Sequence, residues 1–157
     1  MKKPNTSTKN VVNRRARFDY DLGEEIVTGM SLRGVEVAAV RSGRVSLKGA
    51  FVTLRAGQKG QELWLNNASF SLKNQGEGNS DAIDTSPKKL LAHRKQIDNL
   101  AIQKQAGWTI VPLKLLAEGR FIKLVIAPGK GKKLHDKRET LKRKQASRES
   151  ARMMKRF

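Results

Sequence analysis

Between residues 24 and 65, hydrophobic and polar positions alternate in short runs, which is the pattern of half-buried β-strands. The run 24–30 predicts one strand, because its hydrophobic positions fall mainly on one face. Residues 49–56 and 61–65 alternate on either side of Gly57-Gln58-Lys59-Gly60. Two alternating runs joined by a short turn rich in glycine predict a β-hairpin.

A second hairpin is predicted later in the chain. Residues 108–116 and 120–127 alternate around Ala117-Glu118-Gly119. Pro112 has no backbone N–H to donate, so it indicates a sheet edge or a bulge within the first of these runs. Several short antiparallel strands with one or two helices are typical of a small barrel or sandwich.

The pattern changes to helical spacing after Ser86-Pro87, which supply an N-cap residue and a proline suited to the first helical position. Leu90, Leu91, Ile97, Leu100 and Ala101 follow at helical intervals, and Gly107 is a suitable end. The sequence therefore predicts one helix from Pro87 to Gly107.

Two segments are harder to assign. Residues 33–42 favour a strand through three valines, but the alanines beside them and Gly43 after them equally fit a helix. Residues 66–86 are rich in Asn, Ser, Gly and Asp, and they predict an unusually long loop.

Both ends of the chain are polar. Residues 1–12 predict a disordered arm. At the other end, residues 129–133 predict a flexible basic hinge, and the hydrophobic residues beyond it are too sparse to build a core. This tail is predicted to be disordered alone but able to form a helix, because Asp136 and Glu139 resemble a capping box and Glu139 precedes Arg143 by four residues.

Charge is the dominant feature of the composition. The 157 residues suit one domain with tails, and 33 Lys and Arg stand against 14 Asp and Glu, giving a net charge of +19. Such an excess indicates a polyanionic partner, with nucleic acid first and a membrane surface second. The excess is uneven: residues 1–17 carry six basic and no acidic residues, and residues 128–157 carry twelve and three. Residues 18–86 are close to neutral.

The residues that enzymes and metal sites need are scarce. The chain has no cysteine and two histidines, and Gly129-Lys130-Gly131-Lys132 lacks the spacing of a phosphate-binding loop. We therefore expect no catalytic activity, no metal and no cofactor. No apolar run is long enough for a transmembrane helix and no secretory signal is evident, so we expect a cytoplasmic protein without membrane contact.

Basic residues are the candidates for function. Arg14, Arg15 and Arg17 lie together with no acidic residue, which favours contact with phosphate over a merely solubilising role. Lys88, Lys89, Arg94 and Lys95 fall in the first two turns of the predicted helix, where a solvated polar face is an equally good interpretation. His93 is either a surface or packing histidine or a residue that stacks on or hydrogen-bonds a base.

Five ordered motifs resemble the SsrA-binding protein family, also called small protein B, over residues 13–157. They are Asn13-Arg14-Arg15-Ala16-Arg17-Phe18-Asp19-Tyr20, Gly34-Val35-Glu36-Val37 followed by residues 40–48, Lys89-Leu90-Leu91-Ala92-His93-Arg94, Val111-Pro112-Leu113-Lys114-Leu115, and the long run from Gly129 to Thr140. Three positions depart from the family pattern: Val27 and Gln96 replace glutamate, and residues 66–72 lack a histidine and a Pro-Tyr pair.

The resemblance implies a mainly β fold, an OB-fold-like antiparallel barrel with flanking helices and a basic, intrinsically disordered C-terminal tail. It favours a helix for residues 35–42. It divides the chain into a disordered arm (1–12), an RNA-binding domain (13–128) and a basic tail (129–157) that becomes helical on the ribosome. It also implies a non-enzymatic, monomeric protein that binds the tRNA-like domain of transfer-messenger RNA and, with elongation factor Tu, delivers it to stalled ribosomes.

The resemblance also assigns residues to two RNAs. The expected contacts with transfer-messenger RNA are Asn13, Arg14, Arg15, Arg17, Tyr20, Glu36, Lys88, Lys89, Leu91, His93, Arg94, Lys130, Lys132 and Lys133. The expected contacts with the decoding centre and mRNA channel of the small ribosomal subunit are His135, Asp136, Lys137, Arg138, Arg143, Arg152, Met153, Met154 and Lys155. Charge and tail alone also fit a ribosomal or ribosome-assembly protein, and a nucleic-acid-processing enzyme on a barrel is the third hypothesis.

Overall fold

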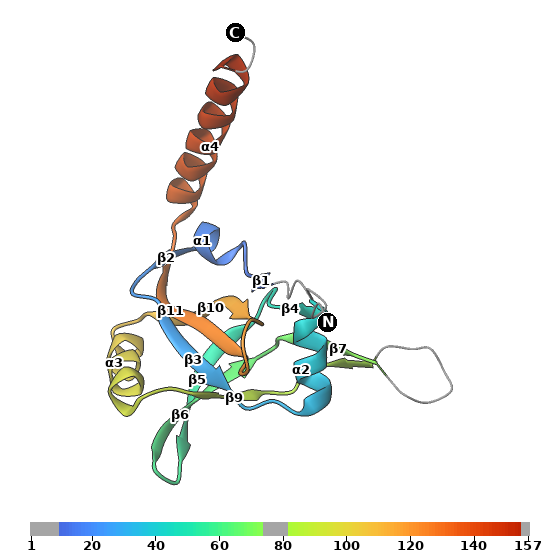
Figure 1. Cartoon of the computed structure of the whole chain (residues 1–157). Coiled ribbons are helices and arrows are strands. Elements are labelled where there is room, and N and C mark those ends of the chain that lie inside the picture. Colours follow the sequence, from blue (N-terminus) through green and yellow to red (C-terminus); the bar gives the residue numbers. More distant parts are fainter. Residues whose placement is uncertain (1–9, 74–81, 155–157) are drawn as a thin grey trace.

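Six antiparallel strands close into a barrel in the computed structural model of the chain, which describes residues 10–73 and 82–154 (Figure 1). Around the barrel they are β10 (Thr109–Leu116), β5 (Phe51–Gly57), β6 (Gly60–Asn66), β9 (Lys88–Leu91), β3 (Ile26–Met30) and β11 (Lys123–Gly131). β11 pairs back with β10 and closes the ring. The OB-like barrel with flanking helices is confirmed.

Both predicted hairpins are present. β5 and β6 pair from Phe51 opposite Asn66 to Gly57 opposite Gly60. β10 and β11 pair along their lengths, with a register shift between Pro112 and Lys114. Of the two alternatives predicted at Pro112, an edge or a bulge, the structure shows the bulge, and a proline without an N–H is tolerated at this position because the ladder is already irregular there.

Two short strands extend the barrel wall: one lies in the predicted N-terminal arm, and the other pairs with part of the predicted hinge. β1 (Val11–Val12) pairs with β10, although residues 1–12 were predicted to be disordered; residues 1–9 lie outside the described residues. β2 (Tyr20–Leu22) pairs with Gly129–Gly131 of β11. The prediction of a flexible hinge at these three residues is wrong, since their backbone groups belong to a ladder.

The predicted long loop 66–86 is also wrong in part. It contains β7 (Ser69–Leu72) and β8 (Ala82–Asp84), which form a small sheet with β4 (Val45–Ser46); residues 74–81 lie outside the described residues. Phe70 is fully buried there and pairs with Val45 and Asp84. The polar composition of the segment hid a strand whose partner lies more than twenty residues earlier in the chain.

The predicted helix from Pro87 to Gly107 is wrong over its first third. Residues 88–91 form β9, and the helix α3 (Arg94–Gln105) begins only after His93. Lys88 and Leu90 are buried whereas Leu91 is exposed, so burial alternates as in a strand. Because Lys88 occupies a buried position, the alternation of hydrophobic and polar residues that is typical of a strand was not visible in the sequence. The spacing of Leu90 and Leu91 from the hydrophobic residues of α3 then matched a helix by coincidence.

The helix that the family resemblance favoured is present: α2 spans Gly34–Arg41. The side chain of Glu36 accepts a hydrogen bond from the backbone N–H of Arg33 at 2.8 Å. In α3, Gln96 accepts one from the N–H of His93 at 3.1 Å. Glutamine and glutamate both fit this third helical position, so the departure at Gln96 retains a helix-capping contact.

The barrel wall is buried on both faces where β10 and β11 meet. Leu124 and Ile126 point into the main core with Ile110 and Leu115, while Val111, Leu113, Val125 and Ala127 form a second cluster with Ala16. Ala16 belongs to α1 (Ala16–Asp19), a single helical turn. α1 therefore covers the outer face of these two strands and is held there by burial.

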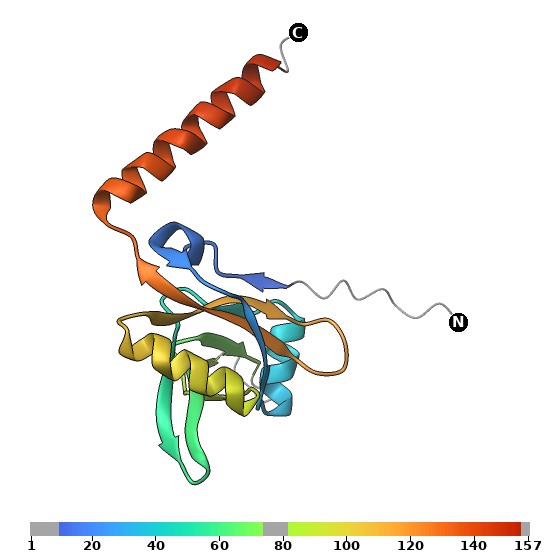
Figure 2. The ribbon, with the colours of Figure 1, turned by 90° about the vertical axis from the view of Figure 1, so that its left-hand side faces the viewer.

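The tail is a helix that leads away from the barrel (Figure 2). α4 spans Leu134–Met154 and buries none of its residues. The tail was predicted to be able to form a helix, and the structure describes residues 134–154 as helical. Lys133 donates its backbone N–H to Asp136 at 3.3 Å, so the N-terminal cap lies three residues before the predicted one.

Candidate RNA-binding surface

Three arginines project from the α1 turn. The backbone N–H of Asn13 donates to the carbonyl of Leu113 at 2.8 Å, and its side-chain amide donates to the carbonyl of Pro112 at 2.9 Å. These bonds and the buried Ala16 fix the turn to β10. The side chains that remain exposed on it are those of Arg14, Arg15 and Arg17. The amide of Asn13 is thus occupied in anchoring.

Three lysines continue this basic region at the end of β11. Lys130 lies opposite Asp21 in the ladder between β11 and β2, and its side chain is exposed. Lys132 donates its N–H to the carbonyl of Asp19 at 2.9 Å and its ammonium group to the carbonyl of Arg17 at 3.2 Å. Lys133 is exposed, and the Tyr20 ring is half-buried against the second cluster. The structure therefore brings the first and fifth sequence motifs together.

The basic residues around β9 are divided between that strand and the start of α3, because the single helix predicted for them does not form. Lys89 pairs with Glu62 at 2.7 Å. Arg94 pairs with Asp98 at 3.2 Å and donates to the carbonyls of Lys59 and Gln61 in the β5–β6 turn. His93 and Leu91 are exposed, and Leu91 retains 54% of its accessible surface.

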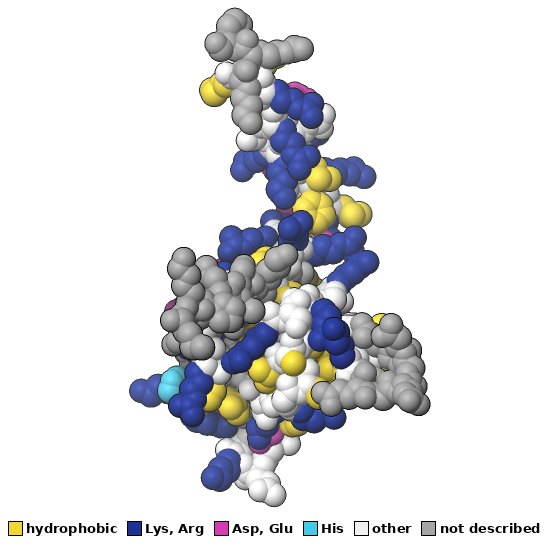
Figure 3. Space-filling model, turned by 45° about the vertical axis from the view of Figure 1, so that its right-hand side comes forward, with side chains coloured by type: hydrophobic (Ala, Val, Ile, Leu, Met, Phe, Trp, Pro, Cys, Tyr) yellow, Lys and Arg dark blue, Asp and Glu magenta, His cyan; other side chains and the backbone are white. Residues whose placement is uncertain are grey.

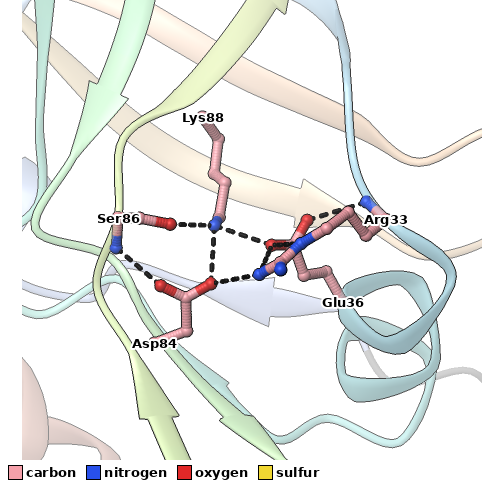
Figure 4. Close-up of polar contacts among 5 residues, drawn as sticks. All are labelled: Arg33, Glu36, Asp84, Ser86 and Lys88. Atoms are coloured by element: carbon pink, nitrogen blue, oxygen red, sulfur yellow. Dashed lines mark hydrogen bonds and ion pairs between the residues drawn. The ribbon is translucent and has the colours of Figure 1, made fainter.

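Lys88 and Glu36 are buried and bound to each other (Figure 4). The ammonium nitrogen of Lys88 lies 2.7 Å from Oε1 of Glu36 and 2.8 Å from Oδ2 of Asp84. Arg33 bridges the same two carboxylates, at 2.8 Å and 2.9 Å. The ammonium group of Lys88 also donates to the hydroxyl of Ser86. This ionic cluster (Arg33, Glu36, Asp84, Ser86 and Lys88) joins α2, β8 and β9.

The cluster keeps both carboxylates ionised. Burial on its own would raise the pKa of Glu36, but hydrogen bonds from Lys88 and Arg33 outweigh it and lower that pKa below its ordinary value. The hydrogen bond from Lys88, followed by one from the N–H of Ser86, holds the pKa of Asp84 well below its usual range. The side chains of Glu36 and Lys88 were expected to contact RNA; the structure places them inside the protein.

The tail presents its basic side chains to solvent along the whole of α4. Figure 3 shows Lys and Arg along the helix and around the adjoining part of the body. The side chains of His135, Asp136, Arg138, Arg143, Arg152, Met153 and Met154 are exposed, and Lys155 lies outside the described residues. Arg143 pairs with Glu139 at 3.2 Å, as the spacing predicted. Lys137 is partly shielded, because its ammonium group lies 3.0 Å from Oδ1 of Asp19.

Sequence reasoning missed one exposed cation on the barrel wall. Lys123 of β11 lies opposite Gly29 of β3, and Gly29 lies opposite Leu91 of β9. Residues directly opposite in a sheet share a face, so Lys123 and Leu91 flank a position without a side chain. The alternation of residues 121–126 already indicated that Lys123 points outward, but only the strand order places it beside Leu91.

A groove of about 560 Å³ lies between α3 and the residues that precede and begin β3. Glu24, Glu25, Val27, His93 and Gln96 line it, with Asn99 and Gln103 further along α3. The two single-residue departures from the family pattern, Val27 and Gln96, therefore face the same groove.

Within residues 10–73 and 82–154, no three or more His, Asp or Glu side chains are grouped so as to hold a metal ion. Over the same residues, no helix combines the length and apolar character needed to span a bilayer.

Comparison with known proteins agrees with this geometry. Residues 10–156 match the family model described as SmpB protein. An SsrA-binding protein of Synechocystis sp. is 43% identical over 145 residues, 92% of either chain. One from Halalkalibacterium halodurans is 44% identical over 144 residues, 91% of this chain and 90% of the relative.

A solved structure described as "tmRNA-SmpB: a journey to the center of the bacterial ribosome" superposes with a TM-score of 0.62 and 32% identity. The superposition covers 80% of this chain and 85% of that one. A barrel with an anchored arginine turn and a projecting basic tail, matched over nearly its full length, shows that the chain belongs to the SmpB family of SsrA-binding proteins.

Proposed function

We propose that this protein binds the tRNA-like domain of transfer-messenger RNA through its body and places its tail in the mRNA channel of a stalled ribosome. The observation that carries the proposal is the separation of the charge into two exposed surfaces. One is fixed on the barrel at α1 and the end of β11, and the other is the free helix α4. The relatives named SsrA-binding proteins, and the related structure whose description names tmRNA and the ribosome, support it.

The body surface suits a folded RNA. Exposed Arg14, Arg15, Arg17, Lys130 and Lys133 provide phosphate contacts from a rigid base, with Asn13, Tyr20 and Lys132 holding that base in shape. Lys89, Leu91, His93 and Arg94 add polar and apolar contacts on the neighbouring wall. Fixed cations on a barrel read the shape of an RNA through its phosphates and 2′-hydroxyls. Glu36 and Lys88 act indirectly, since their ion pair holds β9 in place.

The tail suits a narrow anionic channel. His135, Asp136, Lys137 and Arg138 lie in its first turn, nearest the body, and are the proposed contacts with the decoding centre. Arg143, Arg152, Met153, Met154 and Lys155 follow, and are the proposed contacts along the channel. A helix that buries none of its residues in the free protein has most of its surface available there. Ordering the tail costs free energy, which only an unoccupied RNA-lined channel returns.

The proposal includes the partners of delivery. The protein acts as a monomer in the cytoplasm, and elongation factor Tu accompanies the complex of protein and RNA to the ribosome. The protein performs no chemistry itself, since peptidyl transfer belongs to the ribosome.

A gel-shift titration with the isolated tRNA-like domain, competed by bulk tRNA, tests the proposal. The triple variant Arg14→Ala, Arg15→Ala and Arg17→Ala should weaken binding by about tenfold or more and reduce its salt dependence. The matched control removes three exposed lysines elsewhere, Lys59, Lys73 and Lys104. Equal loss in both variants, or no preference for the tRNA-like domain over tRNA, would overturn the proposal.

A further inference from the structure

The outer wall of the barrel carries an arginine whose charge no carboxylate neutralises. Arg55 of β5 is exposed, and its Cζ lies 5.2 Å from the centre of the Trp64 ring on β6, within the range of a cation–π interaction. One terminal nitrogen of its guanidinium group donates to Oδ1 of Asn66 at 2.9 Å. Arg55 forms no ion pair among residues 10–73 and 82–154, so both of these partners are uncharged.

The carboxylate nearest to Arg55 in the ladder has another partner. Glu62 lies directly opposite Arg55 between β5 and β6, but its Oε1 accepts a hydrogen bond from the ammonium group of Lys89 at 2.7 Å. That hydrogen bond lowers the pKa of Glu62 below its ordinary value. Arg55 extends instead towards Trp64, its diagonal neighbour across the two strands, since Trp64 lies opposite Thr53. The positive charge of Arg55 is therefore free for a ligand.

Asn66 fixes one end of the guanidinium group. The amide nitrogen of Asn66 donates to Oγ1 of Thr53 at 2.9 Å and to the carbonyl of Trp64 at 3.0 Å. Both N–H groups of the amide are thereby used, so its oxygen is the atom that faces Arg55. Asn66 is buried, and its own orientation is held by the protein. The guanidinium group is thus held over the indole ring before any ligand arrives.

The strands beneath this stack of Arg55 on Trp64 are anchored on either side. β6 is paired with β5 along one edge and with β9 along the other. At the turn of the hairpin, Arg94 from the start of α3 donates to the carbonyls of Lys59 and Gln61. A rigid support lowers the conformational entropy that is lost when a ligand binds. The stack is therefore built for binding and does not have to be ordered by it.

The position of the stack indicates which ligand it meets. Trp64 lies opposite Lys89, and Lys89 and Leu91 are two residues apart on β9, so all three side chains share the outer face of the wall. This wall is the part of the body that the proposed function turns towards RNA. Glu62 on the same face has its charge matched by Lys89, so it does not repel an RNA strand beside Arg55.

A planar cation with one free face suits a nucleobase. The indole ring covers one side of the guanidinium group, and the other side is open because Arg55 is exposed. Unpaired bases stack on guanidinium planes, whereas a double helix keeps its bases stacked on one another and offers phosphates instead. We propose that an unpaired nucleotide of the bound RNA stacks on the exposed face of Arg55, with Trp64 and Asn66 as positioning residues. The inference rests on the proposed function, but these three residues belong to none of the five sequence motifs.

Arg55→Lys separates stacking from charge. Lysine keeps the positive charge but has no planar group, so gel shifts with the tRNA-like domain should show binding about tenfold weaker with an unchanged dependence on salt. The matched control is Arg41→Lys, an exposed arginine at the end of α2 that forms no ion pair in the described part of the chain. It should bind like the unsubstituted protein. Equal affinity of the Arg55→Lys variant and the unsubstituted protein overturns the stack.

Acylation of RNA 2′-hydroxyl groups identifies the nucleotide, because unpaired nucleotides react and immobilised ones do not. At saturating protein, at least one unpaired nucleotide that the unsubstituted protein protects should react again with the Arg55→Lys variant. The rest of the footprint should stay the same. Recovery confined to base-paired nucleotides would assign Arg55 to a phosphate, and loss of the entire footprint would assign it to the fold; either result overturns the stack.

A double-mutant cycle tests the role of Trp64. Trp64→Leu should weaken binding several-fold in the unsubstituted protein and little in the Arg55→Lys background, because the indole ring acts through Arg55. Trp64→Phe keeps an aromatic ring and should retain most of the affinity, which a general loss of packing would not explain. Equal losses from Trp64→Leu in both backgrounds overturn the positioning role.

The stack and the proposed function fail in different ways. If the unsubstituted protein has no preference for the tRNA-like domain over tRNA, the proposed function is refuted, and the stack that rests on it is refuted too. If the preference is present while the footprint of the Arg55→Lys variant matches that of the unsubstituted protein, the stack alone is refuted.

Discussion

The ammonium nitrogen of Lys88 lies 2.7 Å from Oε1 of Glu36, and the two side chains are only 5% and 2% exposed. These residues come from β9 and α2, which are more than fifty positions apart in the chain. A lysine inside a protein is stable only when its charge is compensated, and here Glu36 and Asp84 both compensate it. The pair therefore ties the fold of β9 to that of α2.

Removal of one partner should be costly. Lys88→Met leaves the buried carboxylate of Glu36 and the half-buried carboxylate of Asp84 with Arg33 as their remaining cation, and we expect it to lower the free energy of unfolding by about 3 kcal/mol. Lys88→Met combined with Glu36→Gln should cost less than the two single changes together, because each removes the same interaction. Urea denaturation measures both. Lys89→Met, one residue away in a half-exposed pair, is the control; an equal loss there would contradict the prediction.

The same cluster predicts how stability depends on pH. The pKa values of Glu36 and Asp84 are lowered in the folded protein, so folding favours their ionised forms. Their contribution is complete above the pKa of the unfolded carboxyls, about 4, and is lost as pH falls through the folded values.

Urea midpoints measured from pH 7 down to about pH 3 test this dependence. Asp84→Asn should flatten the decline in stability over this range relative to the unsubstituted protein. Glu118→Gln removes an exposed carboxylate that lies outside the ionic cluster, and it should leave the slope unchanged. An Asp84→Asn slope as steep as that of the control would contradict the assignment.

The position at which the tail is removed should decide what is lost. A chain ending at Lys133 retains β11 and its pairing with β2, so we expect it to bind the tRNA-like domain within about twofold of the full chain. It should fail to support tagging of stalled chains, since α4 is gone. A chain ending at Ala127 also loses Gly129–Gly131 and three lysines, and it should bind about tenfold more weakly or worse. Tagging by the chain that ends at Lys133 would refute the role given to the tail.

Leu91, Gly29 and Lys123 lie opposite one another on three neighbouring strands of the barrel wall. From this position we predict that Lys123 contributes to RNA binding, although it belongs to none of the five sequence motifs. Lys123→Ala should weaken binding of the tRNA-like domain several-fold and reduce the salt dependence by about one phosphate contact. Lys104→Ala, on the exposed face of α3, removes the same charge and should have little effect. Gel shifts at two salt concentrations distinguish the two variants, and identical behaviour would exclude Lys123 from the surface.

The helix of the tail should depend on local propensity, because it has few contacts with the body. A helix of this length without packing is only marginally stable in water. Ala146→Gly costs about 1 kcal/mol of helix propensity, so it should lower the far-UV circular dichroism signal of the tail while the unfolding midpoint of the body stays constant. Ser147→Ala should raise the same signal. No response to either change would show that α4 is stabilised by contacts beyond α1.

The alternating pattern was sufficient to predict both hairpins, because the information lies within each pair of strands, and the missing N–H of Pro112 indicated either an edge or the bulge that is present. β9 was missed because Lys88 occupies a core position, and the residues that make this possible are Glu36, far away in sequence, and Asp84, beside a segment interpreted as loop. β7 and β8 were missed for the same reason: their hydrophobic anchor, Phe70, packs in a sheet with a distant strand.

The sequence was sufficient to predict that the candidate surface is basic. It was not sufficient to predict which of the basic side chains have an acidic partner. Arg14 and Arg15 are exposed as expected, whereas Lys89, Arg94 and Lys137 each have an acidic partner. Which cations are available to RNA depends on the positions of the acidic residues after folding. No count of basic residues along the chain contains that information.

β11 also has a mechanical consequence. It crosses the barrel between β10 and β3, continues past β2, and leads into the tail with two residues between the last pairing and α4. Backbone hydrogen bonds in antiparallel sheets lie perpendicular to the strands, so tension on the tail directed along β11 loads many of them in shear at once. A pull that draws the tail into a channel is thereby spread over the barrel wall and does not peel one strand from its edge.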